Sequence, residues 1–153
     1  MRQVMLRVVV PHHSPAECYR RVSDFARYAE QTSAIRQVVV HPPEADGTAL
    51  SDWIVHFRTG QLRWTERDTF DEAARVITFV QAGGDFVVFR GSWTVAPDGT
   101  GARITFDAEF DLGMPTLAEI LDPVAARTLH ESILVILRGL LGAVEEERVG
   151  SAA

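Results

Sequence analysis

The sequence predicts an α+β fold, in which a curved antiparallel sheet of about six or seven strands wraps around one long C-terminal helix, with two short helices after the first strand. Two observations support this prediction. The middle of the chain alternates apolar and polar residues in stretches separated by turn residues, which is typical of a strand meander. The last third keeps its apolar residues at helical spacing. A sheet that curves around such a helix leaves a cavity between the two.

The elements before the meander are marked by proline and by capping residues. Ser14 and Pro15 predict the start of a helix, because serine caps helix N-termini and proline is favoured in the first turn. Asp24 is the predicted cap of a second, shorter helix. The predicted elements in this part are a strand at 4–10, the two helices at 15–22 and 24–30, and a strand at 35–41.

The middle of the chain predicts a run of strands. Turn signals such as Gly83-Gly84 and residues 98–101 recur at strand spacing. The predicted strands lie at about 49–58, 61–70, 75–81, 86–96 and 102–112.

One long helix is predicted over residues 123–147, with Asp122 as its cap and Pro123 in its first turn. Gly139 and Gly142 are unfavourable inside a helix, so they are expected to allow a close approach to the sheet or a bend. Its apolar stripe consists of Leu129, Ile133, Ile136, Leu137, Leu140 and Val144.

Composition excludes several classes of function. The chain has 153 residues and a net charge of −6, which predicts one domain and argues against binding to nucleic acid or anionic lipid. Cys18 is the single cysteine, so no internal disulfide or thiolate metal cluster is expected, and it is interpreted as a small buried apolar residue. We expect a cytoplasmic protein without a signal peptide or membrane span, formed by one domain at 1–149 and a frayed tail at 150–153. The glutamates at 145–147 are interpreted as a solvated helix end.

Alternation places two carboxylates on the inner face of the strand at 61–70. Arg67 and its polar neighbours at 63, 65 and 69 share one face, which we assign to solvent. Glu66 and Asp68 then face the helix, between Trp64 and Phe70. A buried carboxylate has to be paired, hydrated or protonated, and two neighbouring ones raise each other's pKa, which suits acid–base chemistry near neutral pH. The alternative is that both lie near a strand end and reach water.

The same alternation directs the aromatic residues toward the cavity. An aromatic cavity with few polar groups suits a flat, largely apolar ligand, although such residues can equally form plain core. The inward residues of the other strands are Trp53, Val55, Phe57, Val87, Phe89, Gly91, Trp93, Val95, Ile104, Phe106, Ala108 and Phe110. His130, near the edge of the helical stripe, is either a structural histidine or a proton-transfer group. No metal site is expected.

Several stretches together resemble the START-like (SRPBCC, helix-grip) superfamily, and more specifically the aromatase/cyclases of bacterial type II polyketide synthesis. They are Ser14-Pro15 with the following helix, residues 22–30, 64–68 with 71–76, Ser92-Trp93, and residues 109–111. The resemblance implies a helix-grip fold and aldol ring closure with dehydration of a poly-β-ketone, without a cofactor. It also implies that Tyr28, Trp64, Trp93 and Phe106 line the pocket.

The sequence departs from the family pattern at its polar positions. The family's pocket arginine falls at Asp68, its pocket histidine at Ala108, and a polar residue of the long helix at Ile136. Arg67 is adjacent but points outward by alternation. The chain therefore either uses a different acid–base set or binds without catalysis.

Three hypotheses follow. The first is a polyketide cyclase with Glu66, Asp68 and His130 as catalytic groups. The second is a non-catalytic carrier of an apolar aromatic metabolite, and the third is a START-like domain with an unrelated substrate. The expected ligand is a small aromatic or polyketide molecule, and the sequence leaves open whether an acyl-carrier protein delivers it and whether the chain is a monomer or a homodimer. The substrate-binding candidates are Tyr28, Trp53, Phe57, Trp64, Phe89, Trp93, Phe106, Phe110 and Ile133.

Overall fold

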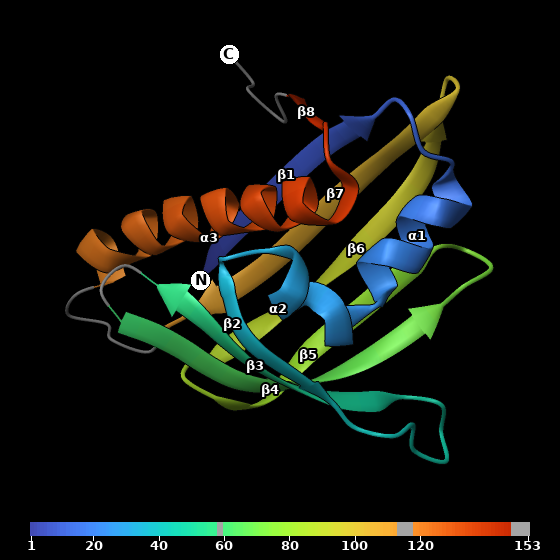
Figure 1. The fold of residues 1–153 in the computed structure, drawn as a ribbon. Helices are drawn as coiled ribbons and strands as arrows, with labels where there is room; N and C mark the ends of the chain where they lie inside the picture. The colour runs from blue at the N-terminus through green and yellow to red at the C-terminus, as the bar shows by residue number, and fades with distance from the viewer. Residues whose placement is uncertain (58–59, 113–117, 148–153) are drawn as a thin grey trace.

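A strongly curved antiparallel sheet grips one long helix (Figure 1). The computed structural model describes residues 1–57, 60–112 and 118–147, apart from the side chains of 118–125. Within these ranges the sheet has eight strands in the order β2-β3-β4-β5-β6-β7-β1-β8. The strands are β1 (Arg2–Val10), β2 (Ile35–Val40), β3 (Ala49–Phe57), β4 (Gly60–Asp71), β5 (Val76–Gly84), β6 (Val88–Asp98), β7 (Gly101–Asp111) and β8 (Glu145–Glu147). The helices are α1 (Pro15–Ser23), η1 (Phe25–Arg27), α2 (Tyr28–Gln31) and α3 (Ala118–Leu141).

The N-terminal helices form as their capping residues predict. Ser14 accepts a hydrogen bond from the backbone N–H of Glu17 at 3.2 Å, and Pro15 occupies the first turn of α1. Together, α1, η1 and α2 cover the part of the concave face that α3 leaves open (Figure 1). The predicted strands of the meander appear with end positions close to those expected.

The long helix differs from the prediction at both ends. It begins at Ala118, before Pro123, because residues 118–121 include good helix formers. It ends at Leu141, because Gly142 adopts a left-handed φ of +77° and its N–H closes the last turn on Arg138.

Beyond that turn the chain forms an eighth strand instead of a helix end. The glutamates of β8 pair with β1, and Glu147 accepts a hydrogen bond from Arg103 at 2.9 Å, so an acidic segment is held at a sheet edge by a cation. The expected tail at 150–153 lies outside the described residues.

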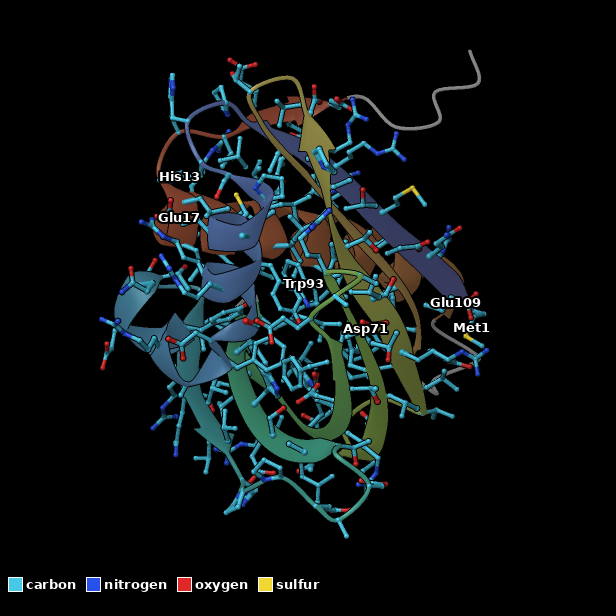
Figure 2. All side chains as sticks on the ribbon, turned by 90° about the vertical axis from the view of Figure 1, so that its right-hand side faces the viewer. Met1, His13, Glu17, Asp71, Trp93 and Glu109 are labelled. Carbon is cyan, nitrogen blue, oxygen red and sulfur yellow. The ribbon has the colours of Figure 1, made fainter. Side chains whose placement is uncertain are left out.

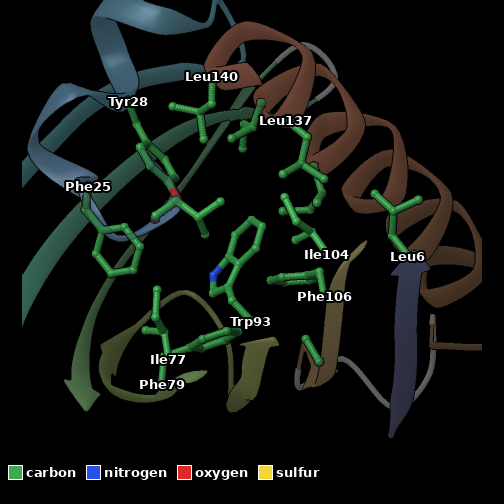
Figure 3. Packing of buried hydrophobic residues seen from close by; sticks show 14 of the residues in the cluster. Leu6, Phe25, Tyr28, Ile77, Phe79, Trp93, Ile104, Phe106, Leu137 and Leu140 are labelled. Carbon is green, nitrogen blue, oxygen red and sulfur yellow. The ribbon is translucent and has the colours of Figure 1, made fainter. Parts of the chain in front are cut away.

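The core fills the space between α3 and the concave face, as Figure 3 shows for part of it. Alternation predicted its strand residues with two differences. Val87 is 63% exposed and Phe86 is buried in its place, because β6 begins only at Val88 and the preceding turn breaks the alternation. Phe70, at the end of β4, is 38% exposed and packs against Phe25. The described charged side chains lie mainly at the periphery, whereas Trp93 lies near the centre (Figure 2).

Gly139 explains how α3 approaches the N-terminal helices. A Cβ at this position would lie 2.1 Å from the backbone oxygen of Gln31, so only glycine allows this contact between α3 and α2. The close approach expected at this glycine is therefore made to α2 and not to the sheet.

Candidate functional site

A cavity of about 50 Å³ lies between α3 and the concave face of the sheet. Its walls are mostly aromatic and aliphatic side chains from β3 to β7, α2 and α3. The lining residues are Val4, Tyr28, Ala34, Ile35, Trp53, Val55, Trp64, Glu66, Phe79, Phe89, Trp93, Phe106, Ala108, Leu129, Ser132, Ile133 and Ile136. None of these lining residues is basic.

The aromatic wall is built by cross-strand pairs. Trp53 of β3 and Trp64 of β4 are directly opposite each other in the sheet, and their rings stack with centroids 5.8 Å apart and planes 1° apart. Phe89 meets Trp64 edge to face at 5.2 Å, and Phe106 meets Trp93 at 4.7 Å. These rings are all buried, so one wall of the cavity consists of packed aromatic side chains.

Two carboxyl groups from β4 are buried beside this wall. Glu66 is 3% exposed and Asp68 is 1% exposed, as alternation along β4 predicted, and neither reaches bulk solvent. Trp64 donates its indole N–H to Glu66 Oε1 at 2.7 Å. Ser51 donates its hydroxyl to Asp68 Oδ2 at 2.5 Å, and Trp53 in turn donates its indole N–H to the Ser51 oxygen at 2.8 Å.

One oxygen of this pair lacks a donor unless the pair holds a proton. Asp68 Oδ1 is buried and receives no hydrogen bond from an N–H or hydroxyl group in the described part of the chain. Burial, the hydrogen bond to Asp68 and the charge of Asp68 raise the pKa of Glu66 well above its usual value. Burial also raises the pKa of Asp68, against the hydrogen bonds from Glu66 and Ser51, which lower it. We infer that the proton of this pair resides on Glu66 and is donated to Asp68, because burial and the charge of Asp68 both raise the pKa of Glu66.

Tyr28 closes the cavity from the helical side. Its ring is fully buried, and its hydroxyl donates to the backbone oxygen of Val22. Burial, followed by the charges of Glu66 and Asp68, raises the pKa of Tyr28 well above its usual value, so the phenol stays neutral.

The structure brings together most of the predicted site residues. Those that line the cavity are Tyr28, Trp53, Trp64, Glu66, Phe89, Trp93, Phe106 and Ile133. Asp68 lies behind Glu66 and is not a lining residue, and Phe57 and Phe110 belong to the surrounding core. Arg67 points away from the cavity, as predicted, and binds Glu44 at 2.7 Å.

His130 is directed elsewhere. Its Nε2 lies 2.6 Å from Glu146 Oε1 of β8, on a side chain 35% exposed, and it is not among the residues that line the cavity. The partner belongs to β8, a strand that was not predicted from the sequence. Cys18 is buried, as expected.

Sequence reasoning missed several cavity residues. Ser51 follows the same alternation as Trp53 and could have been placed inward, but a lone serine gives no sign of its hydrogen-bond partner. Alternation along β5 also places Phe79 on the inner face, so this residue could have been predicted. Ser132 lies one residue before the predicted Ile133 and had no comparable signal.

No group of three or more potential metal ligands occurs in the described ranges. Within the same ranges, no helix has the length and apolar character needed to cross a membrane.

Comparison with known proteins yields a family and a set of similar folds. A family model described as polyketide cyclase / dehydrase and lipid transport matches residues 11–133. No curated protein sequence matches the chain.

Among solved structures, a protein of Thermus thermophilus is 22% identical with a TM-score of 0.83, covering 91% of this chain and 94% of its own. The Zhui aromatase/cyclase of a Streptomyces species is 19% identical with a TM-score of 0.76, covering 92% of both chains. A START superfamily protein of Mycobacterium smegmatis is 20% identical with a TM-score of 0.78, covering 91% of this chain and 96% of its own. At these identities the likeness shows the START-like fold alone.

Proposed function

Because the chain belongs to the polyketide cyclase / dehydrase and lipid transport family, we propose that it closes a ring in a poly-β-ketone by aldol addition and dehydration, with Glu66 and Asp68 as its acid–base pair. The observation that carries this proposal is a buried carboxyl pair at the wall of an aromatic cavity, in which the pKa of both groups is raised and Asp68 Oδ1 has no partner in the described residues. The aromatase/cyclase among the similar structures supports the substrate class.

The pair can both accept and return a proton. Glu66 faces the cavity and Asp68 lies behind it, so the proton can move to Asp68 while Glu66 takes one from the carbon between two carbonyl groups. The electrons of that C–H bond form an enolate, which attacks a second carbonyl carbon and forms the new C–C bond. The pair then returns this proton to the resulting alkoxide. In the dehydration step the pair removes a second carbon-bound proton and gives a proton to the hydroxyl group, so that the C–O bond breaks, a C=C bond forms and water leaves.

The aromatic wall would hold the substrate in one folded conformation. Holding two reacting groups in a near-attack geometry lowers the entropic part of the barrier. This suits a reaction between two parts of one polyketide chain. The cavity of about 50 Å³ is far below the roughly 300 Å³ of ordinary ligand pockets, so binding requires the walls to separate. Substrate delivery by an acyl-carrier protein and the oligomeric state stay predictions.

The test is the product distribution from a poly-β-ketone made by a minimal polyketide synthase, with and without this protein. Asp68→Asn keeps the shape of the side chain but removes its charge, and we expect ring closure to slow about 100-fold or more, the usual scale for a general base. Quenching of tryptophan fluorescence by a polycyclic product should persist in the variant. Glu109→Gln, which removes an outer carboxylate paired with Arg90, is the matched control. Unchanged turnover in Asp68→Asn would refute the assignment.

A second candidate function is binding without catalysis, favoured by the small cavity and by the lack of a basic side chain along its walls. A carrier would bind the polycyclic product and leave the product distribution of the synthase unaltered. The same experiment therefore separates the two functions.

A further inference from the structure

The three tryptophans of the chain line the cavity, and their indole N–H groups differ in whether they have a hydrogen-bond acceptor. Trp53 donates to Ser51, and Trp64 donates to Glu66. Trp93 lines the cavity and is 4% exposed, yet its N–H meets no acceptor among the residues that the structure describes. The fully buried polar atoms without a partner in the described side chains are Arg7 Nε, Tyr19 Oη and Asp68 Oδ1, so the free Trp93 Nε1 borders open space at the cavity wall.

Packing alone does not require a nitrogen at this position. The neighbouring wall positions on β5, β6 and β7 are occupied by Phe79, Phe89 and Phe106, which fill space without a polar atom. A tryptophan at this position adds a hydrogen-bond donor that a phenylalanine would lack, and in the described residues no acceptor takes it up. Figure 3 shows Trp93 at the centre of the cluster, with its indole nitrogen on the side turned toward Phe25 and Tyr28.

We propose that Trp93 Nε1 donates a hydrogen bond to a ligand carbonyl oxygen, and that the cavity therefore selects planar aromatic or conjugated ketones. The inference deepens the proposed function, and it rests on that function for the statement that the ligand carbonyl is enolised. The ligand must supply an acceptor, because Trp93 offers only a donor. Tyr28 cannot replace it as donor, since its hydroxyl is already bonded to Val22.

The same donor would act during enolisation. When Glu66 removes a proton from the carbon next to the carbonyl, the C–H electrons form a C=C bond and the carbonyl oxygen becomes negative. A hydrogen bond to that oxygen strengthens as the charge develops, which is the way an oxyanion site lowers a barrier. The N–H keeps its proton throughout. None of the described residues that line the cavity is basic, so the indole N–H is the donor that we assign to this charge.

The test compares two ligands of nearly the same shape. Acetophenone carries the carbonyl, and α-methylstyrene has a CH₂ group in its place. In the test variant, Trp93 is replaced by 3-benzothienylalanine, which preserves the bicyclic shape and has sulfur in place of the N–H. We expect the dissociation constant of acetophenone to rise roughly 3- to 10-fold in the variant, the scale of one hydrogen bond, while that of α-methylstyrene is unchanged.

Infrared difference spectra of carbon-13-labelled acetophenone, recorded with the unmodified protein and with the benzothienyl variant, supply a second readout. The carbonyl band should lie at lower frequency in the protein than in an apolar solvent, and the shift should vanish in the benzothienyl variant. Equal weakening of both ligands, an unshifted band, or failure of acetophenone to bind at millimolar concentration would each overturn the inference. A shifted band without ring-closing activity would leave the inference standing and refute the proposed function instead.

Discussion

Replacement of Glu66 by glutamine should change how the stability of the protein depends on pH. The side chain is 3% exposed, accepts a hydrogen bond from Trp64 and donates one to Asp68. A glutamine can make both contacts, through its carbonyl oxygen and its amide N–H, so the packing should survive. What the variant loses is the ability to take up or release a proton.

The magnitude follows from proton counting. In the unfolded chain Glu66 titrates near its ordinary pKa of 4.5, whereas burial and Asp68 keep it protonated in the folded protein to a much higher pH. Between these two pKa values, unfolding releases one proton, so the free energy of unfolding falls as pH rises, by about 1.4 kcal/mol per pH unit. In Glu66→Gln this contribution is absent. From pH 5.5 to 7.5 the variant should therefore gain up to about 2.7 kcal/mol relative to the original protein.

Urea unfolding followed by tryptophan fluorescence at several pH values measures the effect. The difference between the two unfolding free energies is the informative quantity, because titrating groups that do not interact with Glu66 contribute equally to both. Glu109→Gln controls for the loss of a carboxylate as such, since Glu109 lies on the outer face beside Arg90. Parallel stability curves for Glu66→Gln and the original protein would show that the pair holds no extra proton and would refute the reasoning.

Two further predictions concern parts of the fold around the site. Gly139→Ala should lower the free energy of unfolding by about 1–3 kcal/mol, the usual cost of overpacking, because its Cβ would collide with the Gln31 backbone. Ala143→Gly is a comparison outside that contact. Equal effects of the two substitutions in thermal unfolding would contradict the explanation. His130→Gln removes the contact between the imidazole and Glu146, so it should lower the free energy of unfolding by less than about 1 kcal/mol and leave the rate of ring closure within a few-fold of normal. A 100-fold loss of turnover would instead show that His130 is a catalytic group.

Alternation along β4 was enough to predict the central feature of the site. The polar face carried by Arg67 and its neighbours fixed the orientation of Glu66 and Asp68, since side-chain period is exactly two in a regular strand. The same rule failed at Val87, where the turn before β6 shifts the pattern by one residue and buries Phe86. Periodicity therefore served well inside strands and poorly at their ends.

The apolar–polar periodicity of the sequence could not predict contacts between residues that are far apart in the chain. The three glutamates at 145–147 have the sequence pattern of a solvated helix end. No local feature shows that Arg103 of β7 donates a hydrogen bond to Glu147 of β8. The partner of His130 could not be predicted for the same reason, since Glu146 belongs to that unexpected strand. The hydrogen bond from Ser51 to Asp68 depends on the register between β3 and β4, which the sequence alone did not supply.

The acidic pair and the free indole together suggest how a site without a cation could handle an enolate. Arg67 is held on the outer face by Glu44 and Thr48, so the negative charge that forms on a substrate oxygen has no neighbouring guanidinium from this strand. It must be met by a hydrogen bond and then by a proton. The charge of the pair therefore matters for activity, because a doubly ionised pair would repel the developing enolate more strongly than a pair that holds one proton. The pH at which the stability difference between Glu66→Gln and the original protein stops growing should therefore coincide with the upper limb of the activity profile.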